Sequence, residues 1–135
     1  MNNRGLAGDY LRRARVRLAA LDVLFAAESW ADVVRESQEI VELACKGLLR
    51  SCGIDPPRVH DVSGILLAQR DRLPPGLSRD VESLAEASRQ LRRDRELAFY
   101  GAEDLTPSDF YSPEDAAAAR DKARRAVEVV FPHVG

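Results

Sequence analysis

The chain has 135 residues, of which 45% are hydrophobic and 31% charged, and its formal net charge is −2. This length suits one domain with its own core, and this composition excludes an intrinsically disordered chain. The small net charge excludes a basic nucleic-acid-binding surface spread over the whole chain, so any such binding needs a local patch. The sequence predicts a single domain over residues 1–135.

No stretch of the sequence has the apolar length of a membrane or export segment. No run approaches the roughly 20 apolar residues that span a bilayer, and the first ten residues lack the apolar centre of a secretory signal. We therefore expect a cytoplasmic protein with no membrane partner.

Hydrophobic spacing predicts a first helix over about residues 8–27. Apolar residues three or four positions apart would form one face of this helix: Leu11, Ala14, Leu18, Leu21 and Phe25.

A second helix is predicted over about residues 30–52. Ser29, followed three positions later by Asp32, is a start signal, and Gly53 is a typical end. The apolar positions cover more than one stripe, so we expect this helix to be central. Cys45 and Cys52 lie roughly 10 Å apart along the helix axis, too far for a disulfide, and are expected to be free.

The remaining elements are bounded by proline, glycine and serine. Proline pairs enclose a short third helix over about residues 60–72, and Ser78 can cap a fourth helix that ends at Tyr100. Residues 101–111 have the composition of an ordered loop. Its expected apolar anchors are Leu105, Phe110 and Tyr111.

The last helix has the clearest start signal in the chain. Ser112 is followed by Pro113 and by acids in the first turn, and Pro132 is expected to stop the helix at about Phe131. No strand-like alternation appears. The predicted fold is all-α, an antiparallel up-and-down helical bundle of four long helices plus one short helix.

The sequence gives no pattern typical of a metal or cofactor site. His60 and His133 are the only histidines, and no cysteine pair or glycine-rich loop has the spacing of a metal or phosphate site, so we expect neither metal nor cofactor. His60 is expected to be a loop or helix-start residue satisfied by a hydrogen bond, with no acid partner evident. Glu42 and Lys46 form an i,i+4 pair, interpreted as a solvated face.

The end of the fourth helix carries the candidate binding residues Arg92, Arg95 and Tyr100. Arg92 and Arg95 are three positions apart and share a helical face, where two guanidinium groups could clamp a phosphate. The alternative is a charge-paired helix end. The acids close enough to neutralise the arginines are Asp94, Glu96, Glu103 and Asp104.

Three segments together resemble the HEPN domain family. Residues 38–49, QEIVELACKGLL, resemble the Q-x-x-x-E-x-x-x-K-x-L-L core of the family's second helix. Residues 60–67, HDVSGILL, resemble the histidine and paired leucines that follow a short loop, and residues 111–116, YSPEDA, are similar to the opening of the last helix. The resemblance implies a helical bundle that forms a homodimer and is often encoded beside a minimal nucleotidyltransferase.

The resemblance also implies a candidate active site, because many members are metal-independent ribonucleases with an Arg-x4-6-His motif. In those members the arginine and histidine of two subunits meet at the dimer interface. Here Arg95 takes the arginine position, but Tyr100 stands where histidine is expected. Tyrosine, with a pKa near ~10, is protonated at neutral pH, so general-base catalysis should be lost while phosphate binding remains. In some family pairs the transferase adenylylates a tyrosine, and Tyr100 is a chemically possible acceptor.

Three functions remain open from the sequence. The first is a nucleotide- or RNA-associated binding module, a homodimer that partners a minimal nucleotidyltransferase in a toxin–antitoxin-like pair and carries a degenerate nuclease motif. The second is a metal-independent ribonuclease toxin whose candidate catalytic residues are Arg95 and Tyr100. The third is a purely structural dimerising bundle.

Overall fold

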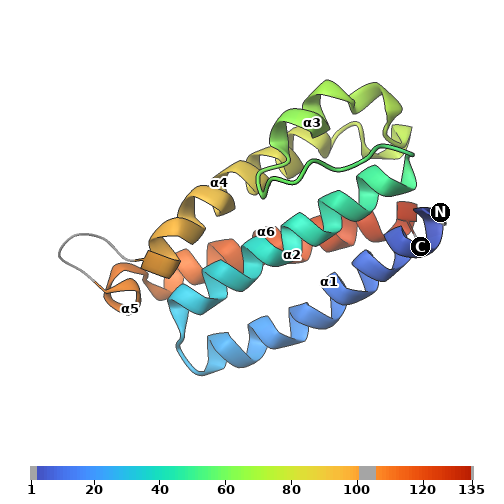
Figure 1. Ribbon diagram of the computed structural model, residues 1–135. Helices are drawn as coiled ribbons and strands as arrows, with labels where there is room; N and C mark the ends of the chain where they lie inside the picture. The colour runs from blue at the N-terminus through green and yellow to red at the C-terminus, as the bar shows by residue number, and fades with distance from the viewer. Residues whose placement is uncertain (1–2, 101–105, 135) are drawn as a thin grey trace.

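The computed structural model describes residues 3–100 and 106–134, without the side chains of residues 3, 95–100, 107 and 109. Four long helices and two short ones make up the fold, and the described residues contain no strand (Figure 1). The long helices are α1 (Asn3–Ala26), α2 (Trp30–Ser51), α4 (Val81–Tyr100) and α6 (Pro113–Val134), and the short ones are α3 (Ser63–Ala68) and α5 (Pro107–Phe110). The predicted all-α bundle is confirmed. None of these helices combines the length and apolar character that crossing a membrane requires.

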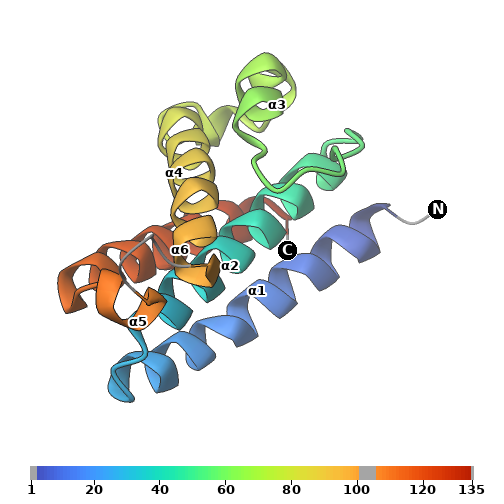
Figure 2. The same cartoon turned by 60° about the vertical axis from the view of Figure 1, so that its left-hand side comes forward.

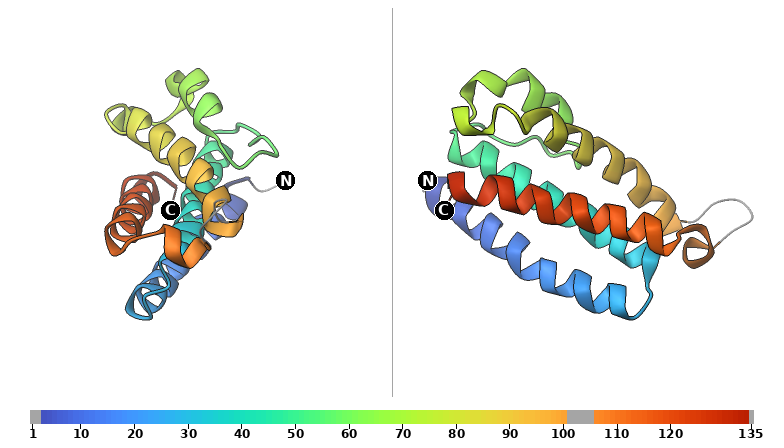
Figure 3. Two further views of the ribbon diagram at one scale, coloured as in Figure 1. Left: turned by 90° about the vertical axis from the view of Figure 1, so that its left-hand side faces the viewer. Right: turned by 180° about the vertical axis from the view of Figure 1, so that it is seen from behind.

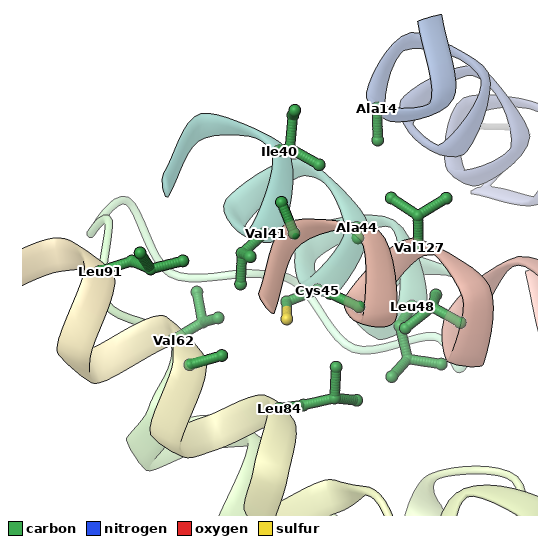
Figure 4. Packing of buried hydrophobic residues seen from close by; sticks show 14 of the residues in the cluster. Ala14, Ile40, Val41, Ala44, Cys45, Leu48, Val62, Leu84, Leu91 and Val127 are labelled. Carbon is green, nitrogen blue, oxygen red and sulfur yellow. The ribbon is translucent and has the colours of Figure 1, made fainter. Parts of the chain in front are cut away.

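Helix α2 is the centre of the bundle, as predicted. The other three long helices surround it, and successive long helices run in opposite directions (Figures 1 and 3). Ile40, Val41 and Leu48 of α2 are fully buried beside Leu91 of α4 and Val127 of α6 (Figure 4). The broad apolar surface of α2 is therefore covered by packing inside one chain.

The two cysteines of α2 are free, as predicted. Cys45 is fully buried in the core, and this burial, followed by the nearby charge of Glu42, raises the pKa of its thiol to about 12. Cys45 therefore behaves as a small apolar core residue.

The first and last helices are both longer than predicted. Helix α1 begins at Asn3, five residues before the predicted start, because fully buried Ala7 extends the core-facing row of Leu11 and Ala14 by one turn. Helix α6 continues through Pro132 to Val134, so the predicted stop at Phe131 was wrong. Proline removes one backbone donor and crowds the carbonyl four residues before it, but burial of Val134 favours the extra turn over this local preference.

The segment between α2 and α4 is less helical than predicted. Helix α3 covers only part of the expected 60–72 range and is followed by two 3₁₀ turns, η1 (Arg70–Arg72) and η2 (Pro75–Leu77). Ser78 does not cap α4: it lies in a turn, and the carbonyl of Asp80 accepts the first helical bond, from the amide of Leu84 at 2.8 Å. Burial of Leu77 at the start of this turn delays the helix.

The segment before α6 was only partly predicted. Its expected anchor Leu105 lies outside the described residues. Phe110 is 37% exposed and sits on the one-turn helix α5, where a loop was predicted, whereas Tyr111 is buried as expected. Ser112 caps α6 through a reciprocal pair of bonds with Asp115, at 3.1 and 2.9 Å.

The start signal of α2 uses different chemistry from that predicted. The helix begins at Trp30, but the Ser29 hydroxyl donates to the carboxylate of Asp32 at 2.6 Å and caps no backbone amide. The sequence pattern located the start of the helix without describing the bond that forms there.

Candidate functional site

A cluster of four polar side chains joins α2 to the segment before α3. We call Gln38, Glu42, Lys46 and His60 the Glu42 cluster, because one carboxylate receives all three partners. Gln38 Nε2 and Lys46 Nζ each donate to Glu42 at 2.9 Å, and His60 Nδ1 lies 2.8 Å from Glu42 Oε1. The three α2 residues are four positions apart, so they lie in a row along one side of the helix.

Glu42 is ionised and largely shielded from solvent. Its side chain is 15% exposed and that of Lys46 is 18% exposed. Burial raises the pKa of Glu42, but hydrogen bonds from Gln38, Lys46 and His60 together lower it below its ordinary value. An ionised carboxylate only accepts hydrogen bonds, so we assign the shared proton to His60 Nδ1.

The interpretation of Glu42 and Lys46 as a solvated face was therefore wrong. The prediction that a hydrogen bond satisfies His60 is confirmed, but its acid partner, Glu42, was missed. The family resemblance could have pointed to this contact. The four residues of the Glu42 cluster are polar positions of the two resembling segments, residues 38–49 and 60–67.

The chain just after His60 is fastened to α4 as well. The Val62 amide donates to Ser88 Oγ at 3.0 Å, and the Ser88 hydroxyl lies 3.5 Å from Asp61 Oδ1. Asp61 also accepts the Ser63 amide at 2.9 Å, which fixes the start of α3. Val62 is buried between α2 and α4 (Figure 4). Residues 60–63 thus form a strap that sets the position of α4 against α2.

The predicted binding residues lie at the far end of α4, and the structure describes only one of their side chains. Arg92 is partly buried and interacts with other residues of the chain, while its neighbour Arg93 is exposed. The backbone of Arg95 and Tyr100 is helical, and their side chains lie outside the described residues. The structure therefore gives no geometry between Arg92, Arg95 and Tyr100.

Tyr111 fixes the end of α4 to the start of α6. Its hydroxyl donates to the backbone carbonyl of Asp94, and its ring meets that of Phe110 edge to face at 5.0 Å. Burial, with smaller contributions from the charges of Asp94 and Asp115, raises the pKa of Tyr111 to about 12. Tyr111 is thus a protonated anchor that positions the last turns of α4.

Comparison with known proteins places this arrangement in a family. The family model for the HEPN domain matches residues 7–132. The chain belongs to the HEPN domain family. No curated protein and no solved structure matches it. The match includes the Glu42 cluster, the strap at residues 60–63 and the Tyr111 anchor. In this HEPN domain the Glu42–His60 contact joins two of the resembling segments, and Tyr111 joins the third to α4.

Neither histidine of this HEPN domain belongs to α4. His60 is held by Glu42, and His133 lies at the end of α6, beside Gly76. The last turn of α6 and the last turn of α4 lie at opposite ends of the bundle (Figure 1). Among the described residues, no group of three or more histidine, cysteine or acidic side chains is arranged to hold a metal ion.

Proposed function

We propose that this HEPN domain is a non-catalytic binding module for RNA or nucleotides, acting as a homodimer beside a minimal nucleotidyltransferase in a toxin–antitoxin-like pair. One observation carries the proposal: Tyr100 follows Arg95 at the spacing where the nuclease motif has histidine. Within one chain, His60 is bound by Glu42, and His133 lies in the last turn of α6, at the end of the bundle opposite the last turn of α4.

The chemistry of the α4 end supports binding over cleavage. Cleavage of RNA by this motif needs a group that accepts a proton at neutral pH, and tyrosine is protonated there. Guanidinium groups keep their charge, so Arg92 and Arg95 retain the ability to hold phosphate oxygens. The Tyr111 anchor supports this role because it fixes the backbone at Asp94, between the two arginines.

The homodimer is proposed on the family resemblance alone. The breadth of the apolar surface of α2 gives no support for it, because the neighbouring helices of the same chain cover that surface. In the proposed dimer the α4 ends of two subunits face a shared cleft, so each phosphate site contains arginines from both chains.

RNA binding and cleavage test the proposal directly. Purified protein is expected to bind a fluorescein-labelled 20-nucleotide oligouridylate without cleaving it, as followed by anisotropy and gel electrophoresis. Arg92→Gln should weaken binding about 5–10-fold, the effect of losing one charge-assisted phosphate contact of about 1–1.4 kcal/mol. Arg93→Gln is the matched control, since it removes the same charge from the exposed neighbouring residue. Melting curves check that both variants stay folded.

Two outcomes would contradict the proposal and select another function. Cleavage that disappears in Arg95→Ala and in Tyr100→Phe would identify the ribonuclease alternative, with Arg95 and Tyr100 as catalytic residues. If Arg92→Gln and Arg95→Gln leave RNA binding unchanged, the α4 end is not part of the RNA-binding site. The role of the α4 end would then be structural.

The partners require separate measurements. We expect light scattering to give twice the mass of the chain at micromolar concentration, and the product of a neighbouring nucleotidyltransferase gene to co-purify with it. A monomer would contradict the shared cleft, and a transferase that never associates would contradict the proposed pair.

A further inference from the structure

Two arginines from different helices converge on one tyrosine at the α1–α2 crossing. The guanidinium carbons of Arg13 in α1 and Arg50 in α2 lie 6.0 and 5.6 Å from the ring centroid of Tyr10. We call these three residues the Tyr10 site. Tyr10 is partly buried and Arg13 is exposed, so solvent reaches the site.

The two arginines of the Tyr10 site have no carboxylate partner among the described residues. Neighbouring arginines do have one: Arg12 pairs with Asp9 at 2.8 Å, and Arg17 pairs with Glu36 at 3.2 Å. The Nε atom of Arg50 is buried and has no hydrogen-bond acceptor in the described part of the chain. The site therefore keeps two positive charges in a chain whose net charge is −2.

Stabilisation of a helix end explains only half of this arrangement. Arg50 lies in the last turn of α2, where a cation interacts favourably with the helix dipole. Arg13 lies near the middle of α1, so no helix terminus accounts for its charge. Stacking on tyrosine contributes a cation–π interaction, but it leaves the N–H edges of a guanidinium available.

The Tyr10 site is held in place by a close helix crossing. A Cβ atom added to Gly47 would lie 3.2 Å from Tyr10 Cβ and 3.3 Å from the Ala7 carbonyl oxygen, so α1 and α2 nearly touch there. Tyr10 and Arg13 lie in the first half of α1 and Arg50 in the last turn of α2, whereas α4 ends at the other end of the bundle from the end of α2 (Figure 1). The site is thus separate from Arg92 and Arg95.

We propose that the Tyr10 site binds backbone phosphates of an RNA strand, an inference that rests on the proposed RNA-binding function. Guanidinium groups without a carboxylate partner bind phosphate oxygens through charge-assisted hydrogen bonds, and the Tyr10 ring holds both groups at one place on the surface. A strand held at both the Tyr10 site and the α4 end runs along the length of the bundle. The same phosphate chemistry occurs in free nucleotides, which the experiment separates.

The test compares two charge-matched double variants with the same labelled 20-nucleotide oligouridylate. Arg13→Gln/Arg50→Gln removes the unpaired charges, and Arg12→Gln/Arg70→Gln removes two arginines that are paired with Asp9 and Glu82. The first should weaken binding at least tenfold, and the control at most about twofold. The slope of log affinity against log salt should fall by roughly 1.4 in the first variant only, because each phosphate contact contributes about 0.7 for a single strand.

Arg13→Gln alone guards against a folding artefact, because this side chain is exposed. It should weaken RNA binding about three- to fivefold with an unchanged melting temperature.

Equal losses of RNA affinity in the two double variants would overturn the proposal. Displacement of the oligouridylate by uridine monophosphate or inorganic phosphate at micromolar concentration would overturn it as well. Loss with Arg13→Gln/Arg50→Gln but not with Arg92→Gln supports the Tyr10 site and contradicts the proposed role of α4. The reverse pattern overturns the Tyr10 site alone, and wild-type protein that binds no RNA overturns both.

Discussion

Glu42→Ala is expected to lower the free energy of unfolding by about 2–3 kcal/mol, because it takes this acceptor from Gln38 and Lys46, two largely buried donors. Gln38 is 2% exposed, so its amide cannot turn to water in place of the lost carboxylate. The strap at residues 60–63 also loses its contact with α2, since His60 is bound there by Glu42. Urea denaturation followed by circular dichroism measures the change.

Glu86→Ala is the control for this substitution, because Glu86 is exposed and accepts one hydrogen bond, from Gln90 at 3.1 Å. We expect it to change stability by less than about 0.5 kcal/mol. Equal losses in the two variants would show that Glu42 acts as an ordinary surface carboxylate.

The contribution of Glu42 should also depend on pH. Its pKa in the folded chain lies below its ordinary value of 4.5, so the unfolded chain binds the proton more readily. The stabilisation is therefore present above the unfolded pKa and is lost as the pH falls through the folded pKa. Wild-type protein should therefore lose more stability than Glu42→Gln as the pH falls from about 6 to about 3. Parallel pH profiles for the two proteins would contradict this assignment.

Gly47→Ala is expected to destabilise the fold by about 1–2 kcal/mol, although alanine is the better helix former by about 1 kcal/mol. The added methyl group would overlap Leu11, which is 1% exposed and has no space into which to move. The same methyl group would lie 3.3 Å from the Ala7 carbonyl oxygen, which cannot shift unless the α1 backbone moves. The crossing of α1 and α2 must open, and this should also weaken RNA binding at the Tyr10 site.

Gly8→Ala provides the matched control, since Gly8 is also inside a helix and an added Cβ would meet no atom within 4 Å. We expect this variant to be stabilised by about 0.5–1 kcal/mol. If the close crossing of α1 and α2 requires glycine at position 47, Gly47→Ala lowers the melting temperature and Gly8→Ala raises it. Stabilisation by both substitutions would show that α1 can move away without loss.

The sequence predicted the fold well wherever local chemistry decides the structure. The central position of α2 follows from its broad apolar surface, and the bonds between Ser112 and Asp115 follow from residue type and spacing. The errors occur where tertiary packing overrides local preference. Burial of Val134 carries α6 past a proline, and burial of Leu77 moves the start of α4 beyond Ser78.

The candidate site was harder to predict because its contacts join distant parts of the chain. Glu42 and His60 are 18 positions apart and meet only once the strap folds back along α2. Arg13 and Arg50 meet only because Gly47 lets α1 approach α2, and no local pattern encodes that meeting. The segment resemblance did identify the residues of the Glu42 cluster, but it did not give their contacts.

The stretch between α2 and α4 has a consequence for how the molecule opens. Figure 2 shows α3 standing away from α1 and α6, on the side of α4. Residues 54–80 are held by the bonds of His60 and Val62, by exposed side-chain bonds of Arg70, Arg72 and Asp80, and by buried side chains that include Leu66 and Leu77. Fewer contacts must break to release this stretch than to unfold the long helices, so it forms a local unfolding unit of lower free energy. The bonds to Glu42 and Ser88 must break for this release, so they help to set how often the covered side of α2 meets solvent.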